Sequence, residues 1–158
     1  MLRKVMPVMA LLASGTCCAA PAACFKPAEV EAANLRVLQQ QFNVAALNCQ
    51  TSDPHATFAT RYNQFIKSFE VQLLKNSEIL VRHFGKDGSL DRWMTRVAND
   101  AGQSVYKKSD FCQVAWDRLE EINQLTGEQM VAYAGNISVA AEFAPACPET
   151  LKKAAAGK

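Results

Sequence analysis

Apolar residues recur at spacings of three and four along most of this 158-residue chain, a spacing that places their side chains on one face of an α-helix. The first such row runs through Leu35, Leu38, Phe42, Ala45 and Cys49. The alternation of apolar and polar residues that is typical of a half-buried strand is scarce. The pattern therefore predicts an all-α fold.

Turn and capping residues divide this periodic sequence into four helices. We expect the first helix to begin near Pro27 and the second to run roughly from Pro54 to Phe84, where Gly85-Lys86-Asp87-Gly88 ends it. Ser89 is expected to cap the third helix, and the fourth carries the apolar residues from Phe111 to Leu125. Thr126 and Gln129 resemble a capping box, which predicts a short fifth helix. Asn76 interrupts the aromatic-rich row of the second helix. Because short connections favour antiparallel neighbours, the expected architecture is an up-down four-helix bundle.

The first 22 residues have the pattern of a secretory signal peptide. Arg3 and Lys4 form a basic start, Val5–Ala13 is apolar, and Ala20-Pro21-Ala22 supplies a small-x-small cleavage site. The apolar stretch is too short for the roughly 20 residues that span a bilayer, so we expect no integral membrane segment after cleavage. The predicted organisation is a signal peptide at 1–22, a helical domain at 23–147 and a mobile tail at 148–158. We therefore expect a periplasmic or secreted protein, with a lipid-anchored form left open by the cysteines near the cleavage site.

Composition and charge argue against a disordered chain and against a nucleic-acid-binding protein. Hydrophobic residues make up 49% of the chain and charged residues 20%, which is typical of a globular protein. The formal net charge is +2 and falls to zero without Arg3 and Lys4. A neutral domain has no general attraction for nucleic acid, so we expect no nucleic-acid partner.

Four cysteines remain after the predicted cleavage: Cys24, Cys49, Cys112 and Cys147. In an oxidising compartment an even number favours disulfides, and four cysteines allow three pairings. They lack the close CxxC spacing of structural zinc sites, so we expect no metal. In an up-down bundle Cys49 and Cys112 lie at one end and Cys24 and Cys147 at the other. The predicted disulfides are therefore Cys49–Cys112 and Cys24–Cys147.

Five short segments, spread over most of the predicted mature chain, carry a family resemblance. They are Cys24-Phe25-Lys26-Pro27-Ala28-Glu29, residues 38–49 (LQQQFNVAALNC), Tyr62-Asn63-Gln64-Phe65, His83-Phe84-Gly85 and Phe111-Cys112. Together with the cysteine framework they resemble small exported helical proteins of alphaproteobacteria, in which Trp stands at the position of Phe25. Such proteins often bear the name S-adenosyl-L-homocysteine hydrolase by automatic assignment. The chain lacks the GxGxxG loop and the strand–helix alternation of that NAD-dependent enzyme. The resemblance thus implies an exported helical fold and supplies no established activity to carry over to this chain.

No motif of nucleophilic catalysis or of cofactor binding occurs in the sequence, so we expect no catalytic residues and no cofactor. Tyr62 and Asn63 form a polar pair beside the apolar row of the second helix, and they are candidates for a surface or pocket site. His83 is a further candidate, although a basic residue in the last turn of a helix also suits the helix dipole.

These features favour a binding protein whose partner is an envelope protein or a small apolar ligand. The leading alternative is an envelope hydrolase whose site forms only in three dimensions. It requires a cleft in which at least two of five residues meet, namely Tyr62, Asn63, His83, Asp91 and Arg92. A secreted inhibitor or immunity protein is a third interpretation.

Overall fold

In the computed structural model, residues 24–50 and 57–148 are described, and they form six α-helices and no named strand. The helices are α1 (Pro27–Asn48), α2 (Phe58–Ser68), α3 (Glu70–Phe84), α4 (Ser89–Lys107), α5 (Phe111–Asn123) and α6 (Gly127–Asn136). The predicted all-α fold is confirmed. The predicted signal peptide at 1–22 and almost all of the predicted tail lie outside the described residues.

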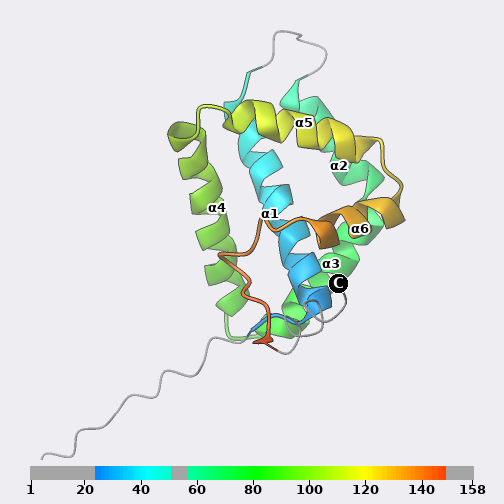
Figure 1. The fold of residues 1–158 in the computed structure, drawn as a ribbon, viewed down its shortest axis with the longest axis vertical. Coiled ribbons are helices and arrows are strands. Elements are labelled where there is room, and N and C mark those ends of the chain that lie inside the picture. The colour runs from blue at the N-terminus through cyan, green and yellow to red at the C-terminus, as the bar shows by residue number, and fades with distance from the viewer. Residues whose placement is uncertain (1–23, 51–56, 149–158) are drawn as a thin grey trace, which may run out of the picture.

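The long helix α1 lies at the centre of the molecule and contacts each of the other five helices. Its predicted row through Leu38 and Phe42 is buried, and a second row through Ala33 and Val37 is buried as well. In Figure 1, α1 and α4 run along the long axis, whereas α5 and α6 run across it. The four-helix up-down arrangement is therefore not confirmed, because α1 is covered on several sides rather than along one face.

The predicted second helix is divided into two helices, α2 and α3. Phe69, with φ −116° and ψ 21°, ends α2 and precedes α3. Its ring is buried against Phe65, with the ring centroids 5.5 Å apart. α2 begins at Phe58, where the Thr57 hydroxyl accepts a hydrogen bond of 3.2 Å from the amide of Thr60. The expected start at Pro54 lies among residues that the structure does not describe.

Two glycines make the turn between α3 and α4. Gly85 has φ 71° and Gly88 has φ 76°, which is the left-handed region that residues with a Cβ rarely adopt. The prediction that Ser89 caps α4 is wrong, because Gly88 occupies the cap position and Ser89 is the first residue of the helix. The Ser89 amide donates to the carboxylate of Asp87 at 3.0 Å. The predicted capping box of Thr126 and Gln129 is present at the start of α6.

The core consists of two clusters on different sides of α1. One contains Phe42, Phe65, Phe69, Leu119 and Ile122, contributed by α1, α2, the residue between α2 and α3, and α5. The other cluster is formed by α1, α3, α4 and the two segments that flank the helices, and its buried members include Phe25, Val37, Leu80, Trp93 and Ala140. Packing of α1 between two clusters explains why its apolar residues do not form one stripe.

Two disulfides join the pairs that the sequence predicts, Cys24–Cys147 and Cys49–Cys112. Next to the first of them, the Phe25 amide donates to the Pro145 carbonyl at 2.9 Å and the Cys147 amide donates to the Phe25 carbonyl at 3.0 Å. The chain before α1 and the chain after α6 are thus fastened together. Two disulfides are compatible with a location outside the cytoplasm.

None of the helices in the described ranges combines the length and the apolar composition that crossing a bilayer requires.

Candidate functional site

A cavity of about 410 Å³ lies between α1, α3 and α6. Each helix contributes residues three and four positions apart, so one face of each helix lines the cavity. The lining residues are Ala28, Glu31, Ala32 and Leu35 from α1, Gln72, Lys75, Asn76 and Ile79 from α3, and Gly127, Glu128, Val131 and Ala134 from α6. The volume falls within the range of roughly 300–1,000 Å³ that is typical of small-molecule sites.

Asn76 is the one buried polar residue that lines this cavity, within the ranges described. Its side chain is only 5% exposed, and its Nδ2 is shielded from solvent without a hydrogen-bond partner. A buried amide without a partner lowers the free energy of unfolding by about 1–3 kcal/mol, because the hydrogen bonds that it makes to water in the unfolded chain are not replaced in the folded protein. Asn76 therefore places an unpaired, shielded amide in the wall of the cavity.

Gly127, the first residue of α6, allows the side chain of Gln72 to approach the helix. A Cβ at Gly127 would collide with the amide end of the Gln72 side chain. Both residues line the cavity. Because Gly127 has no side chain, the side-chain amide of Gln72 can lie against the start of α6 in the wall of the cavity.

Charged residues line the cavity only on exposed parts of the helices. Glu31, Lys75 and Glu128 are exposed, and none of them forms an ion pair within the described residues. The charges are of both signs, so the entrance has no strong preference for an anion or a cation. A mainly apolar wall with one buried amide fits a neutral molecule best.

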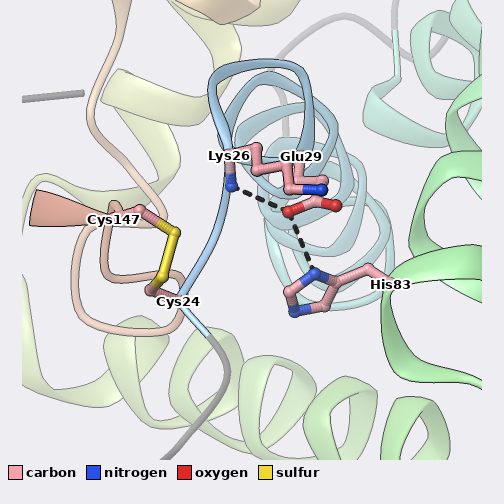
Figure 2. The surroundings of a disulfide bond; sticks show 5 residues. All are labelled: Cys24, Lys26, Glu29, His83 and Cys147. Atoms are coloured by element: carbon pink, nitrogen blue, oxygen red, sulfur yellow. Dashed lines mark hydrogen bonds and ion pairs between the residues drawn. A yellow bond between two sulfur atoms is a disulfide. The ribbon is translucent and has the colours of Figure 1, made fainter. Parts of the chain in front are cut away.

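His83, a predicted candidate, lies at a different place. Its Nδ1 lies 3.1 Å from Oε2 of Glu29, and the backbone amide of Lys26 donates to the same oxygen at 2.7 Å. The imidazole ring stacks on Phe25, with centroids 4.0 Å apart. Figure 2 shows Lys26, Glu29 and His83 beside the Cys24–Cys147 disulfide. These contacts connect the end of α3 to the start of α1, a structural role.

Tyr62 and Asn63, the other candidates, are adjacent on α2 but differ in their surroundings. Tyr62 is half-buried and stacks against Phe65, whereas Asn63 is exposed. Burial raises the pKa of the Tyr62 phenol, and Gln39 and the positive charge of Arg36 partly oppose this shift. The two residues do not line the α1–α3–α6 cavity.

The hydrolase interpretation requires that at least two of its five residues meet in a cleft, and these residues lie on three helices, with Tyr62 and Asn63 on α2, His83 on α3, and Asp91 and Arg92 on α4. Arg92 donates to the Asp87 carbonyl at 3.4 Å and to the Ser89 hydroxyl at 3.3 Å, within its own turn. Asp91 lines a smaller cavity between α1, α3 and α4. Among the described residues, neither Asp91 nor Arg92 forms a hydrogen bond or ion pair with His83 or Tyr62. Across residues 24–50 and 57–148, no group of three or more histidine, cysteine or acidic residues is placed to hold a metal ion.

Asn76 was visible in the sequence as the interruption of an apolar row, but that signal alone did not identify a site. A polar residue in such a row is equally typical of a helix that turns its face toward solvent. Only the packing of α6 against α1 and α3 shows that Asn76 is buried and lines a cavity. Comparison of the chain with protein-family models, with curated proteins and with solved structures found no match.

Proposed function

We propose that this chain is a binding protein that holds a small, mainly apolar molecule in the cavity between α1, α3 and α6. The observation that carries the proposal is the unpartnered amide of Asn76 in the wall of a cavity of about 410 Å³. The ligand class is a neutral molecule with an apolar body and one hydroxyl, carbonyl or amide group. That group would form the hydrogen bond that Asn76 lacks.

The physical basis is a balance between stability and binding. An unpartnered buried amide lowers the free energy of unfolding of the empty protein. The same amide raises the affinity for a ligand that offers a hydrogen bond and disfavours an analogue that offers none. A residue kept only for packing in this row would instead be apolar.

We further propose that the protein acts outside the cytoplasm and is related to the exported four-cysteine proteins that its sequence resembles. The signal-like residues 1–22 and the two disulfides support this location. An envelope-protein partner stays a prediction. The surface on which to look for it is the face of α3 on which Val71, Leu74 and Val81 are exposed.

The experiment uses 1-naphthol and naphthalene as probes, because they differ by a single hydroxyl group. We expect 1-naphthol to shift the side-chain amide resonances of Asn76 in ¹H–¹⁵N spectra and to bind about tenfold more tightly than naphthalene, a difference of about 1.4 kcal/mol. In Asn76→Leu this preference should disappear, while the free energy of unfolding should rise by about 1–2 kcal/mol.

The matched control is Asn63→Leu, the same exchange at an exposed position of α2. It should change neither the affinity for 1-naphthol nor the preference over naphthalene. Gly127→Ala is a second test, because the new methyl group displaces Gln72 at the cavity wall while alanine favours the helix. This variant should stay folded and bind 1-naphthol with altered affinity. Binding that is unchanged in both Asn76→Leu and Gly127→Ala would rule out this cavity as the site.

A further inference from the structure

A second cavity, of about 230 Å³, lies between α1, α3 and α4. Its lining residues are Arg36, Ser77, Leu80, Leu90, Asp91 and Met94. It shares no residue with the α1–α3–α6 cavity, which borders α6 instead of α4. The smaller cavity contains two charged residues of opposite sign and three apolar ones.

Arg36 is a partly buried cation without a carboxylate partner. Its Nη2 donates to the Ser77 hydroxyl, which in turn donates to the Leu73 carbonyl at 2.9 Å. Its Nε is shielded from solvent and has no acceptor, and no described carboxylate lies within ion-pair distance of the guanidinium. Desolvation lowers the pKa of Arg36 below its ordinary value, but arginine keeps its charge at physiological pH. A partly buried, unpaired cation is costly, so this group favours a bound anion.

Asp91 restricts which anion the cavity can accept. It lies in the first turn of α4, lines the same cavity as Arg36, and forms no ion pair among the residues described. A simple anion at Arg36 would be repelled by the Asp91 carboxylate. A molecule that carries both a carboxylate and an ammonium group would instead meet an opposite charge at each residue.

The remaining walls and the volume define the rest of the ligand. Leu80, Leu90 and Met94 supply apolar surface for an aliphatic group. About 230 Å³ lies below the range of roughly 300–1,000 Å³ that is typical of drug-sized ligands and suits a molecule of amino-acid size. We propose that this cavity binds a free amino acid with an aliphatic side chain, its carboxylate at Arg36 and its ammonium group toward Asp91.

The test compares three probes by calorimetry on the full disulfide-bonded protein. L-Leucine carries both charges, 4-methylpentanoate lacks the ammonium group, and isoamylamine lacks the carboxylate. We expect L-leucine to bind and each of the other two to bind about tenfold more weakly or worse, because each leaves one protein charge unpaired.

Variants assign the binding to this cavity. Arg36→Met and Asp91→Asn should each weaken L-leucine binding by about tenfold or more, whereas Arg96→Met, the same exchange at an exposed arginine of α4, should leave it unchanged. If Arg36→Met does not fold, the surface variant Asp91→Asn and the probe comparison still decide the question. Absence of L-leucine binding, equal binding of 4-methylpentanoate, or binding that survives in Asp91→Asn would overturn the proposal. Asn76→Leu should not change the affinity for L-leucine, because Asn76 does not line this cavity. The proposal for this cavity and the proposal for the α1–α3–α6 cavity are therefore tested independently.

Discussion

Asn34 Oδ1 accepts a hydrogen bond of 3.0 Å from the backbone amide of Ala140, which lies 106 positions further along the chain. Nδ2 of the same side chain donates to the carbonyls of Ala134 and Ile137, at 3.0 and 2.7 Å. Asn34 is only 1% exposed. One side chain of α1 thus satisfies three backbone groups at the end of α6 and beyond, and it fixes the helix that forms one wall of the larger cavity.

Asn34→Leu should therefore be strongly destabilising, although leucine is a good helix former and fits an apolar surrounding. The substitution leaves two carbonyls and one amide without partners, of which the Ile137 carbonyl is only partly buried, and we expect the free energy of unfolding to fall by about 3 kcal/mol. Urea unfolding monitored by circular dichroism measures the loss. The matched control is Asn99→Leu at an exposed position of α4, which should change stability by less than about 0.5 kcal/mol. Equal effects of the two exchanges would contradict the assigned role of Asn34.

Removal of either disulfide should destabilise the protein by a similar and large amount. The bridges close loops of 63 and 123 residues, for which chain entropy alone gives about 4 and about 5 kcal/mol. We expect the paired variants Cys49→Ser with Cys112→Ser, and Cys24→Ser with Cys147→Ser, to lower the midpoint of urea unfolding strongly. Full reduction of the native protein should lower it further. Midpoints within error of the native protein would show that the folded helices alone supply the stability.

His83 and Glu29 should be energetically coupled, because their side chains connect α3 to α1. His83→Ala removes the ring that stacks on Phe25 and leaves the Glu29 carboxylate with only the Lys26 amide, and we expect a loss of about 2 kcal/mol. His83→Phe keeps a ring and should lose less. A double-mutant cycle with Glu29→Gln measures the coupling, for which we expect at least about 0.5 kcal/mol. Strict additivity of the two substitutions would argue against the interaction.

Tyr62 should make the folded protein less stable at alkaline pH. Burial raises the pKa of its phenol, so above the ordinary tyrosine value of about 10 the unfolded chain has released the proton while the folded chain still holds it. The contribution of the protonated Tyr62 phenol to the free energy of unfolding is therefore fully present below about pH 10 and is lost as the pH rises through the raised pKa of the folded state. Urea unfolding between about pH 8 and 11 should show a smaller decline for Tyr62→Phe than for the native protein. Tyr133→Phe is the companion variant, because burial and the charge of Glu121 also raise the pKa of that phenol.

Local features of the fold could be predicted because each depends on residues close together in the sequence. Pro27 begins α1, Gly85 and Gly88 make the turn before α4, and Thr126 with Gln129 caps α6. Capping and backbone conformation involve neighbours within one helical turn, so their signals are complete in a short segment. The division of the second helix at Phe69 had no such signal, because Phe69 continues the apolar row of the predicted helix and is neither a glycine nor a proline.

The cysteine pairing was a partial exception to this locality. Cys24–Cys147 and Cys49–Cys112 were predicted from the ends of helices in a four-helix bundle, and these pairs formed although that arrangement was not confirmed. The pairing depends only on which helix ends lie near one another: the start of α5 lies beside the end of α1, and the chain after α6 returns to the start of α1 (Figure 1).

The sequence by itself determined the helical class, most helix ends, the capping box of α6 and the pairing of the cysteines. The tertiary structure alone decided which polar residues of those helices are buried, and with this both candidate sites. Asn34, Asn76 and Arg36 lie on helices whose pattern gives no partner for them, since their surroundings come from α6 and α4, far along the chain. Whether a buried polar side chain has a hydrogen-bond partner depends on atoms that only folding brings together. Hydrophobic periodicity describes one helix at a time and contains no information about the distance between groups on different helices.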